Sequence, residues 1–442
     1  MARPRTINFR DRLVKMFSPS LLERLARDNG AVIRRRKVAP SALFWTVVLG
    51  FGLGRERTIA GLRRSYQKAT GQTIEESSFY NRFNEGFARL LRAAVGLALD
   101  TVPGINRALR GPLAAFRDLV VTDSTVMRLH DLLQGPFPAC RTNHTKAALK
   151  MHAVLSVNGA GDNSIKITAE RRHDGPVFRV GPWVQGKLLL FDLGYFRYQL
   201  FACITRNKGW FVSRLKRSAN PVIVSVNRTH RGRAIELIGK RLNEVVDNLT
   251  REVLDVMVEV SFTRRVYGGR RRRGRQTLRV VGVRDPETRR YHLYITNLSP
   301  DKLLAEDIQR VYAARWEVEL LFRELKSQYR IEDLPSGKRV VVESLVYAAL
   351  LTWIASRRLL SEVRRKLGRL ADRVPLHRWA VIFASIAQEL LVLMAQPPRR
   401  TRLLVRLTSE MVLHEAIDPN ASRLPLLQTV ETRTHAYHRK AA

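Results

Sequence analysis

The first 108 residues place their hydrophobic positions three and four apart, which predicts helices. Ser18-Pro19-Ser20 and Pro40-Ser41 have the residue types of helix starts, and Gly71 closes a helix predicted over 58–68. Residues 73–76 have the form of a capping box that opens a long predicted helix over 77–99. This arrangement is compatible with helix-turn-helix geometry, and equally with a small helical bundle that has a polar face.

From residue 113 the pattern changes to short apolar runs separated by turn residues, which predict strands. Two of these runs end in an acid, Asp123 and Asp192, and a helix is predicted over 196–205. Strands mixed with helices in this order predict an α/β class with a mixed sheet, as in the ribonuclease H-like fold. The predicted strands are 119–123, 147–157, 164–171, 188–192, 210–215, 221–227, 253–262, 278–284 and 291–296.

Helical periodicity returns after residue 298, and the stretch 311–330 is the most informative of the chain. It contains strong helix formers without Gly or Pro, which predicts one helix over 311–330. At about 100° per residue an apolar stripe and a polar stripe form side by side, with Glu317 and Glu324 outside both. The apolar stripe is Val311, Ala314, Val318, Phe322 and Leu325, and the polar stripe is Tyr312, Arg315, Glu319 and Lys326. Further helices are predicted over 340–367 and 375–395, and the last twenty or so residues are expected to be frayed.

The polar stripe has two interpretations. A solvated helix face pairs Glu with Lys at i,i+4, and this explains the charges alone. It does not explain why a Tyr and an Arg share the stripe with the one Glu near the core. A phosphate chain passing over a carboxylate that holds a metal explains all four residue types, so we favour that interpretation.

Asp123 and Asp192 share one local pattern: at least four strand-like residues, then the acid, then a small residue or a turn. Neighbouring strands that end together would bring both acids to one edge of a sheet, where Glu319 could join them from a helix. A single Asp at such a place is usually a strand-end cap. Two matched acids followed by the ordered helix favour a metal site instead, and three carboxylates suit two Mg²⁺ ions, with Mn²⁺ as an alternative.

Other acids are weaker candidates for this site. Asp118 precedes its predicted strand, and Asp131 lies in a polar stretch. Asp255 lies within an alternating strand and is expected to point outward.

The charge of the chain indicates a polyanionic partner. There are 78 Lys and Arg against 39 Asp and Glu, a net charge of +39. A folded protein this cationic favours nucleic acid as its partner, with an anionic membrane second. The stretch 264–275 is a Gly-punctuated arginine loop between two predicted strands, and we expect Arg270, Arg271, Arg272 and Arg273 to contact DNA phosphates. Arg82 is expected to contact DNA from the N-terminal helices.

Other classes of protein are disfavoured by composition. The two cysteines, Cys140 and Cys203, exclude a disulfide framework, and no HExxH or CxxC cluster is present. The basic start lacks an apolar core, so no signal peptide is expected. Apolar runs such as 42–54 and 345–355 are too short to span a bilayer, so we expect a soluble, cytoplasmic protein.

The spacing Tyr312-x2-Arg315-x3-Glu319-x6-Lys326, with Trp316 after the Arg, resembles the motif of the DDE transposases of bacterial insertion sequences, specifically insertion sequence family four. The resemblance extends along most of the chain. Asp123 in VTDSTV, Asp192 in FDLGYF and the following WFVSRLK are similar to the family's first acid, second acid and next strand. The long gap before Glu319 is similar to the family's β-rich insertion.

The resemblance implies a transposase that cuts element ends and joins them to target DNA by Mg²⁺-dependent phosphoryl transfer. Asp123, Asp192 and Glu319 would be the catalytic metal ligands, and Tyr312, Arg315 and Lys326 would hold DNA phosphates. The implied partners are terminal inverted repeats and target DNA, with a homodimer in the DNA complex and a bacterial, nucleoid-associated location. Some members stack a flipped base on a Trp of the insertion. Residues 220–296 contain none, so Phe262 or Tyr267 takes that place or the step differs.

The resemblance and the patterns together predict five regions: a helical DNA-binding domain (1–108), the first part of a ribonuclease H-like core (109–217), a β-rich insertion (218–297), the core helix with the third acid (298–334) and a helical C-terminal region (335–442). Two alternatives remain open. A stand-alone nuclease on the same core would need the acids but no joining step, and a non-catalytic nucleic-acid-binding protein would explain only the charge.

Overall fold

The computed structural model describes residues 6–32, 38–51, 57–99, 109, 111–140, 145–157, 163–228, 236–263, 273–334 and 336–418, without the side chain of Glu317. One nine-stranded mixed sheet forms the centre, in the order β3-β2-β1-β4-β5-β9-β8-β7-β6. The predicted mixed α/β class is therefore confirmed. The strands are β1 (Asp118–Leu129), β2 (Ala147–Ser156), β3 (Ser164–Ala169), β4 (Lys187–Phe191), β5 (Trp210–Arg214), β6 (Val222–Val226), β7 (Val253–Thr263), β8 (Arg273–Arg284) and β9 (Tyr291–Thr296).

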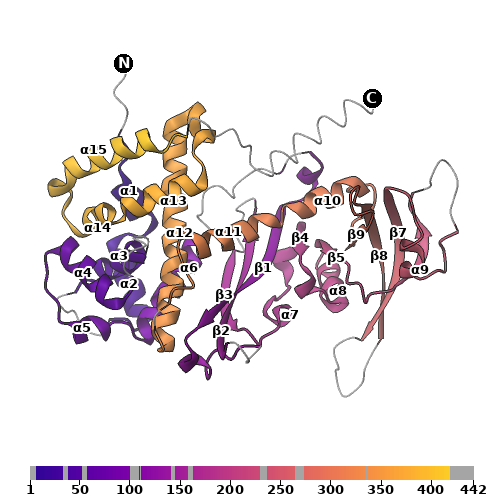
Figure 1. Ribbon diagram of the computed structural model, residues 1–442, viewed down its shortest axis with the longest axis horizontal. Helices are drawn as coiled ribbons and strands as arrows, with labels where there is room; N and C mark the ends of the chain where they lie inside the picture. The colour runs from indigo at the N-terminus through magenta and orange to yellow at the C-terminus, as the bar shows by residue number, and fades with distance from the viewer. Residues whose placement is uncertain are drawn as a thin grey trace.

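Helices gather mainly at one end of this sheet (Figure 1). Those that precede the sheet in the chain are α1 (Phe9–Met16), α2 (Pro19–Asp28), α3 (Pro40–Phe51), α4 (Ile59–Thr70), α5 (Glu76–Tyr80) and α6 (Glu85–Leu99). Those between and after the strands are α7 (Asp174–Val177), α8 (Tyr198–Arg206), α9 (Leu242–Val246), α10 (Ala305–Ala313), α11 (Trp316–Ser327), α12 (Arg339–Leu367), α13 (Leu376–Ser385), α14 (Ala387–Ala395) and α15 (Pro398–Glu415). Short 3-10 turns include η2 (Asp131–Leu133) and η4 (Leu193–Tyr195).

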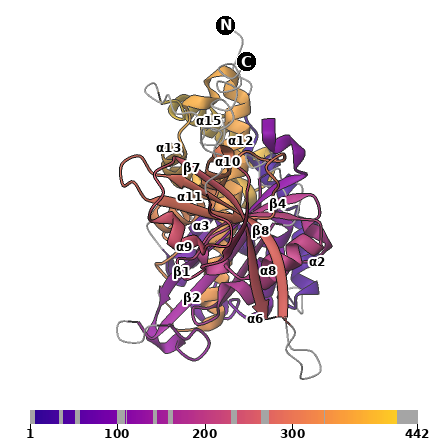
Figure 2. The same ribbon diagram turned by 90° about the vertical axis from the view of Figure 1, so that its right-hand side faces the viewer.

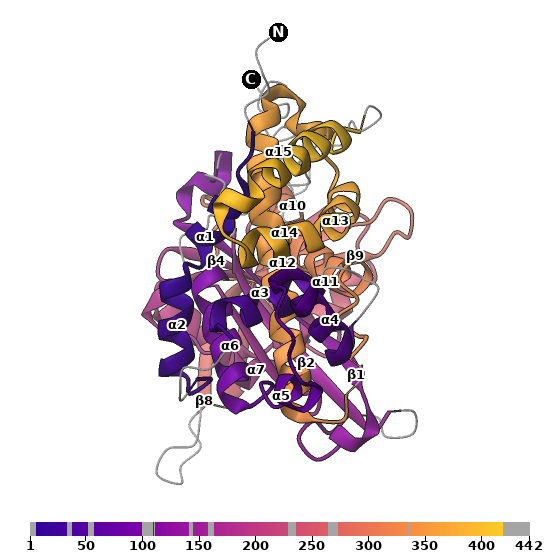
Figure 3. The same cartoon turned by 90° about the vertical axis from the view of Figure 1, so that its left-hand side faces the viewer.

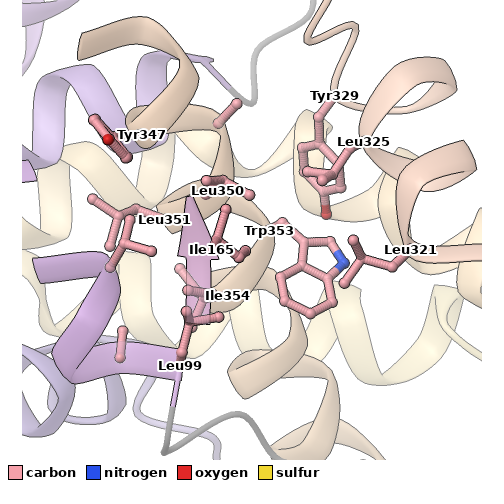
Figure 4. Close-up of a cluster of buried hydrophobic side chains, with 14 of the residues drawn as sticks. Leu99, Ile165, Leu321, Leu325, Tyr329, Tyr347, Leu350, Leu351, Trp353 and Ile354 are labelled. Carbon is pink, nitrogen blue, oxygen red and sulfur yellow. The ribbon is translucent and has the colours of Figure 1, made fainter. Parts of the chain in front are cut away.

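The first and last helices pack together as one helical body, although they are far apart in the sequence (Figure 3). Helix α12 runs through its middle and contacts α3 and α6, while α14 contacts α3 and α4. Their buried side chains form one hydrophobic core that continues beneath the sheet. In Figure 4, Leu99 of α6, Ile165 of β3 and Leu321 of α11 lie around Leu350 and Trp353 of α12. The body and the sheet are thus joined by continuous apolar packing.

Both faces of the central strands are buried. Along β1, Leu119 and Val121 belong to the core shared with α10–α12, whereas Val120 belongs to a second core that includes Phe201 of α8. The side chains alternate because successive residues of a strand point to opposite faces. Helices α10 and α11 run along the first face from β8 to β1, as Figures 1 and 2 show. Both faces of β4 are buried as well, since each of its residues is buried.

Several predicted helix boundaries are confirmed. Ser18 caps α2, since its side chain accepts a hydrogen bond from the Leu21 amide at 3.2 Å. Gly71 ends α4 in the left-handed conformation, with φ of 71°. Helix α12 begins one residue before its predicted start and ends at the predicted residue, Leu367.

Other predicted helices are interrupted. The predicted capping box at 73–76 is wrong: α5 begins without a side-chain cap, and the Glu76 carboxylate lies 3.4 Å from Arg63 instead. The single helix predicted over 77–99 is divided into α5 and α6, because the Asn84 side chain accepts a hydrogen bond from the Phe87 amide and starts a new helix. The predicted helix over 375–395 is likewise two helices, α13 and α14, bent by 52° at Ile386.

By length and composition one described helix could cross a membrane, the segment Arg339–Arg373 that contains α12. The bent pair α13 and α14 passes the same test when taken together. In the segment Arg339–Arg373, 83% of the apolar window is buried inside the fold, as in the core helix of a folded protein.

Candidate active site

The two strand-associated acids lie next to each other. The parallel ladder between β1 and β4 ends at Thr122 and Phe191, so Asp123 and Asp192 follow at equivalent positions. The alternation that buries Leu119 and Val121 against the helices places Asp123 on that same face. One expectation is wrong: β1 does not end at Asp123 but continues to Leu129, because its antiparallel pairing with β2 continues there.

Helix α11 brings Glu319 to these acids. The predicted apolar stripe, from Val311 to Leu325, is buried throughout and fixes which side of the helix faces the sheet. The single helix predicted over 311–330 is wrong in detail: α10 and α11 meet at a tight turn, where the Ala314 and Arg315 amides bond to carbonyls three residues earlier. Arg315 stands at this junction. The spacing of residues does not reveal such a local tightening.

Arg315 connects two of the three acids. Its Nη1 donates to Asp123 Oδ2 at 3.0 Å and its Nη2 to Glu319 Oε1 at 2.5 Å. Asp123 Oδ1 accepts a further hydrogen bond from the Ser124 amide at 2.8 Å. Arg315 is only 9% exposed, and its Nε has no hydrogen-bond partner among the described residues. A buried guanidinium with a donor to spare is a suitable place for one more anionic group.

The electrostatics of the site are resolved at Asp123. Burial raises the pKa of Asp123 to about 6, against the opposing effects of the Ser124 amide and the Arg315 charge. The charges of Asp192 and Glu319 raise the pKa of Asp123 further. A carboxylate whose pKa is raised by burial and by neighbouring acids is stabilised in its ionised form by a cation beside it.

The other two residues of the polar stripe, Tyr312 and Lys326, already form hydrogen bonds within the protein. The Tyr312 hydroxyl donates to the carbonyl of Phe191, directly before Asp192, at 3.2 Å, and burial raises the pKa of Tyr312. Lys326 Nζ donates to the Val126 carbonyl at 2.9 Å and lies 2.7 Å from Glu332. Tyr312 thus fastens α10 to the end of β4, and Lys326 fastens α11 to β1.

The side chains here are suitable metal ligands, but they are not arranged as a complete metal-binding site. Within the described ranges, no three His, Cys, Asp or Glu side chains form a group ready to hold a metal ion. Arg315 instead holds oxygens of Asp123 and Glu319. The donor chemistry nevertheless fits, because three carboxylates facing one cation are the oxygen ligands that Mg²⁺ and Mn²⁺ prefer.

Two acids that make defined contacts were missed by sequence reasoning. Glu324 is buried against α12, where its Oε2 accepts from Trp353 Nε1 at 3.0 Å and from Arg357. Its position between the buried Leu321 and Leu325 was the available signal. Asp174, at the start of α7, contacts the segments after Asp123 and Asp192, and no sequence pattern indicated it.

Among the weaker candidates, the expected outward orientation of Asp255 is wrong. Asp255 does not point outward but is 4% exposed and paired with Arg279. The alternation of β7 puts it on a face that α10 covers. Asp118 lies at the start of β1 and accepts from Ser156 Oγ at 2.6 Å, and Asp131 begins η2 and accepts from the Lys146 amide.

Of the expected DNA contacts outside α10 and α11, the structure describes Arg82 and Arg273, which belong to separate elements. Arg82 is half-buried in the turn between α5 and α6, and Arg273 is exposed at the start of β8. Arg270, Arg271, Arg272 and Tyr267 lie outside the described residues. Phe262, near the end of β7, packs against Tyr198 with ring centroids 6.4 Å apart.

Comparison with known proteins decides the family. Residues 114–355, more than half of the chain, match the family model described as the transposase DDE domain. The chain belongs to this transposase family. The matched range includes Asp123, Asp192 and Glu319, so the predicted resemblance to a DDE transposase is confirmed.

Curated proteins with similar sequences are named as transposases of insertion sequence elements. The transposase for insertion sequence element IS231F of Bacillus thuringiensis subsp. israelensis is 19% identical over 81% of this chain and 82% of the relative. The transposase for insertion sequence element IS231B of Bacillus thuringiensis subsp. berliner is 20% identical over 83% and 86%. The probable transposase for insertion sequence element IS5377 of Geobacillus stearothermophilus is 26% identical over 59% and 62%. The transposase is thus similar to insertion-sequence transposases over most of its length.

Proposed function

We propose that this transposase cuts the ends of its own insertion sequence and joins them to target DNA by Mg²⁺-dependent phosphoryl transfer. The observation that supports this most is Arg315 holding Asp123 and Glu319 together beside Asp192, within the range that matches the transposase DDE domain. The functional residues of the proposed site are Asp123, Asp192, Glu319, Tyr312, Arg315 and Lys326.

The fold division is part of the proposal. The order β3-β2-β1-β4-β5, with β1 antiparallel to β2 and parallel to β4, supports a ribonuclease H-like core over 109–217. Strands β6–β9 would be the insertion of 218–297, which extends the same sheet through the pairing of β9 with β5. Residues 298–334 return to the core with α10 and α11. The helical region 1–108 would bind DNA, and its described helices pack with those of the helical C-terminal region 335–442.

The three carboxylates would hold two Mg²⁺ ions, with Mn²⁺ as a substitute. The chemistry that such a metal pair supplies is polarisation of the scissile phosphate and activation of water or of a 3′-hydroxyl. The position of Asp123 and Asp192 at the end of one parallel ladder, with Glu319 on α11 beside them, supports this assignment. No side-chain nucleophile is needed.

Arg315, Tyr312 and Lys326 would position the DNA strand. The unused Nε–H of Arg315 offers a donor to a phosphate oxygen next to the acids. Because its guanidinium lies between Asp123 and Glu319, a phosphate placed on Arg315 also lies beside the proposed metal ligands. Tyr312 and Lys326 would keep α10 and α11 in register with β4 and β1, and Lys326 could add a charge toward the DNA backbone.

DNA affinity would come mainly from phosphate neutralisation. The chain has a net charge of +39, and the arginines 270–273 and Arg82 would contribute contacts outside the active site. Pairing two element ends would require a homodimer in the DNA complex, and a bacterial cytoplasmic, nucleoid-associated location would follow from the substrate.

The decisive experiment uses the purified protein and DNA that contains the inverted repeats flanking its coding region. We expect Mg²⁺-dependent cleavage that leaves 3′-hydroxyls at the element ends, followed by their joining to a target plasmid. Cleavage without joining would instead support a nuclease, and binding without cleavage would support a non-catalytic DNA-binding protein.

A further inference from the structure

Behind the proposed active site, the opposite face of the sheet carries a second polar cluster. Ser124 follows Asp123 and therefore points away from α11, to the face where its register partner on β2 is His152. Lys150, two residues before His152, lies on the same face. Asp174, the first residue of α7, meets all three side chains.

Asp174 is held by β1 and β2 together. Its Oδ1 lies 3.2 Å from His152 Nδ1 and 3.6 Å from Lys150 Nζ, and Ser124 donates a hydrogen bond to its carboxylate. His152 is itself only 4% exposed and bonds Thr168 of β3 through Nε2 at 2.8 Å. Burial alone would raise the pKa of Asp174, but the contacts with His152 and Ser124 and the Lys150 charge hold that pKa below its ordinary value. Asp174 is therefore an ionised group fixed to the sheet at the position just after Asp123.

The same carboxylate also supports the turn after Asp192. That turn is η4, and its Gly194 has no side chain at the point where Asp174 Oδ2 approaches. A Cβ built on Gly194 would lie 2.9 Å from Oδ2, and the Asp174 carboxyl group supplies both of the described heavy atoms within 4 Å of it. Gly194 thus leaves room for one specific neighbour. Its φ is not positive, so the requirement for glycine comes from this close approach and not from backbone strain.

We propose that Asp174 is a positioning residue that braces the segments after Asp123 and after Asp192 from the back of the sheet, so that the two acids stay at a fixed separation. The inference rests on the proposed function, since it concerns how two proposed metal ligands are aligned. Asp174 is not itself a metal ligand: its partners Ser124 and His152 lie on the face opposite to α11. Residues that orient metal ligands in this way typically contribute about 10–100-fold to metal affinity or activity.

The test begins with Mn²⁺ binding to the full-length protein without DNA, measured by calorimetry or electron paramagnetic resonance. Asp174→Ala should weaken Mn²⁺ binding by about 10-fold or more, and cleavage should fall by a similar factor and recover partly at high Mn²⁺. Asp174→Asn keeps an oxygen that can accept from Ser124 and should lose less. Glu259→Ala, which removes an exposed acid of β7, is the control and should change neither quantity.

A double-mutant cycle separates a brace from a general effect on folding. Gly194→Ala alone should lower Mn²⁺ affinity and cleavage, because its Cβ meets the Asp174 carboxylate. In the Asp174→Ala background this Cβ meets no carboxylate, so Gly194→Ala should cost less than about twofold. Penalties that simply multiply would overturn the proposal, and so would an Asp174→Ala protein that binds Mn²⁺ as tightly as the original.

Different results would refute the proposed function and the proposed role of Asp174. If Asp123→Ala still cleaves DNA, the assignment of the metal ligands is wrong. If Asp123→Ala is inactive while Asp174→Ala binds Mn²⁺ and cleaves normally, the active site stands and the brace alone is refuted. Unfolding curves of each variant, compared at equal temperature, exclude loss of activity through unfolding.

Discussion

The Asp255–Arg279 pair and the Asp123–Arg315 pair both lie largely buried, and they differ in how completely their hydrogen bonds are satisfied. In the pair of β7 and β8, Arg279 binds both oxygens of Asp255 at 2.8 and 2.6 Å and gives its third nitrogen to the Leu303 carbonyl at 2.7 Å. In the pair of α11 and β1, Arg315 binds one oxygen of Asp123 and one of Glu319, and its Nε has no partner among the described residues.

We interpret the difference as that between a structural pair and the pair of the proposed active site. The guanidinium of Arg279 has each of its nitrogens bonded and is 1% exposed, so it has nothing to offer a ligand. Arg315 keeps an unused donor and sits among acids whose charges raise the pKa of Asp123. An incompletely satisfied buried group is costly unless another partner completes it, and the partner we propose is DNA phosphate.

The largest effect should come from removing the acids around Arg315. Asp123→Ala, Asp192→Ala and Glu319→Ala should each lower DNA cleavage by about 1,000-fold or more, which corresponds to about 4 kcal/mol of activation free energy. DNA binding, measured by fluorescence anisotropy, should change little, because it depends mainly on the cationic surface. Glu287→Ala in the turn after β8 is the control. Near-normal cleavage by any one of the three acid variants would remove that residue from the site.

Breaking the satisfied pair should act on folding instead. Asp255→Ala leaves Arg279 charged and buried without its partner, which should lower the free energy of unfolding by about 3–5 kcal/mol in urea titrations. The double variant Asp255→Leu with Arg279→Met removes both charges and should regain most of that loss. At a temperature where it is folded, the double variant should cleave DNA. If it stays folded but inactive, the pair has a role in the reaction.

The contrast between the two pairs also shows what a sequence can predict. The acids Asp123 and Asp192 and the stripe of α11 were predictable, because strand alternation and helical periodicity are local patterns. The partner of Asp255 was not, since Arg279 lies on a neighbouring strand and the pattern of residues does not give the register between two strands.

Local interruptions escaped prediction for a related reason. Asn84 starts a second helix where the residues alone favoured one long helix, and the tight turn at Arg315 depends on contacts with a distant strand. Asp174 was not predictable at all, because its contacts are with Ser124, His152 and Gly194, which three separate segments supply. Functional residues that are spaced regularly within one helix or strand can be predicted from the sequence. Residues that come together from loops and from opposite faces of a sheet can be identified only from the folded structure.

A smaller effect should follow from changing the shape of the unsatisfied cation while keeping its charge. Arg315→Lys retains a positive charge but cannot bridge Asp123 and Glu319 while also offering a donor to phosphate. Cleavage and joining of precut ends should fall by about 10–100-fold, which corresponds to about 1.4–2.8 kcal/mol. The fold, measured by circular dichroism, should be unchanged. Arg323→Lys, at an exposed position of the same helix, is the matched control. Activity lost in Arg323→Lys but kept in Arg315→Lys would contradict the assignment of the helix faces.

The smallest expected effect is an increase in the free energy of unfolding when Asp123, in the pair with the unsatisfied Arg315, is replaced by Asn. Burial raises the pKa of Asp123 from its ordinary value of 3.8 to about 6, so the folded protein favours the protonated acid. The unfolded chain loses this proton at lower pH. Folding is therefore opposed progressively as pH rises from about 4 to about 6, and fully above that range. Asp123→Asn imitates the protonated acid and should increase the free energy of unfolding by about 1–3 kcal/mol at pH 7, measured with a chelator present.

Near pH 4 this advantage of Asp123→Asn should disappear, because the acid is then protonated in the original folded protein as well. The comparison is best made from urea titrations of both proteins across pH 4 to 7, with Asp255→Asn as the contrasting variant. Asp255→Asn should be destabilising, since it takes the negative charge away from a fully bonded Arg279. A loss of stability in Asp123→Asn at pH 7 would mean that its ion pair with Arg315 outweighs the cost of burying the acid. The two pairs would then be alike, and the unused Nε of Arg315 would no longer distinguish a site prepared for DNA.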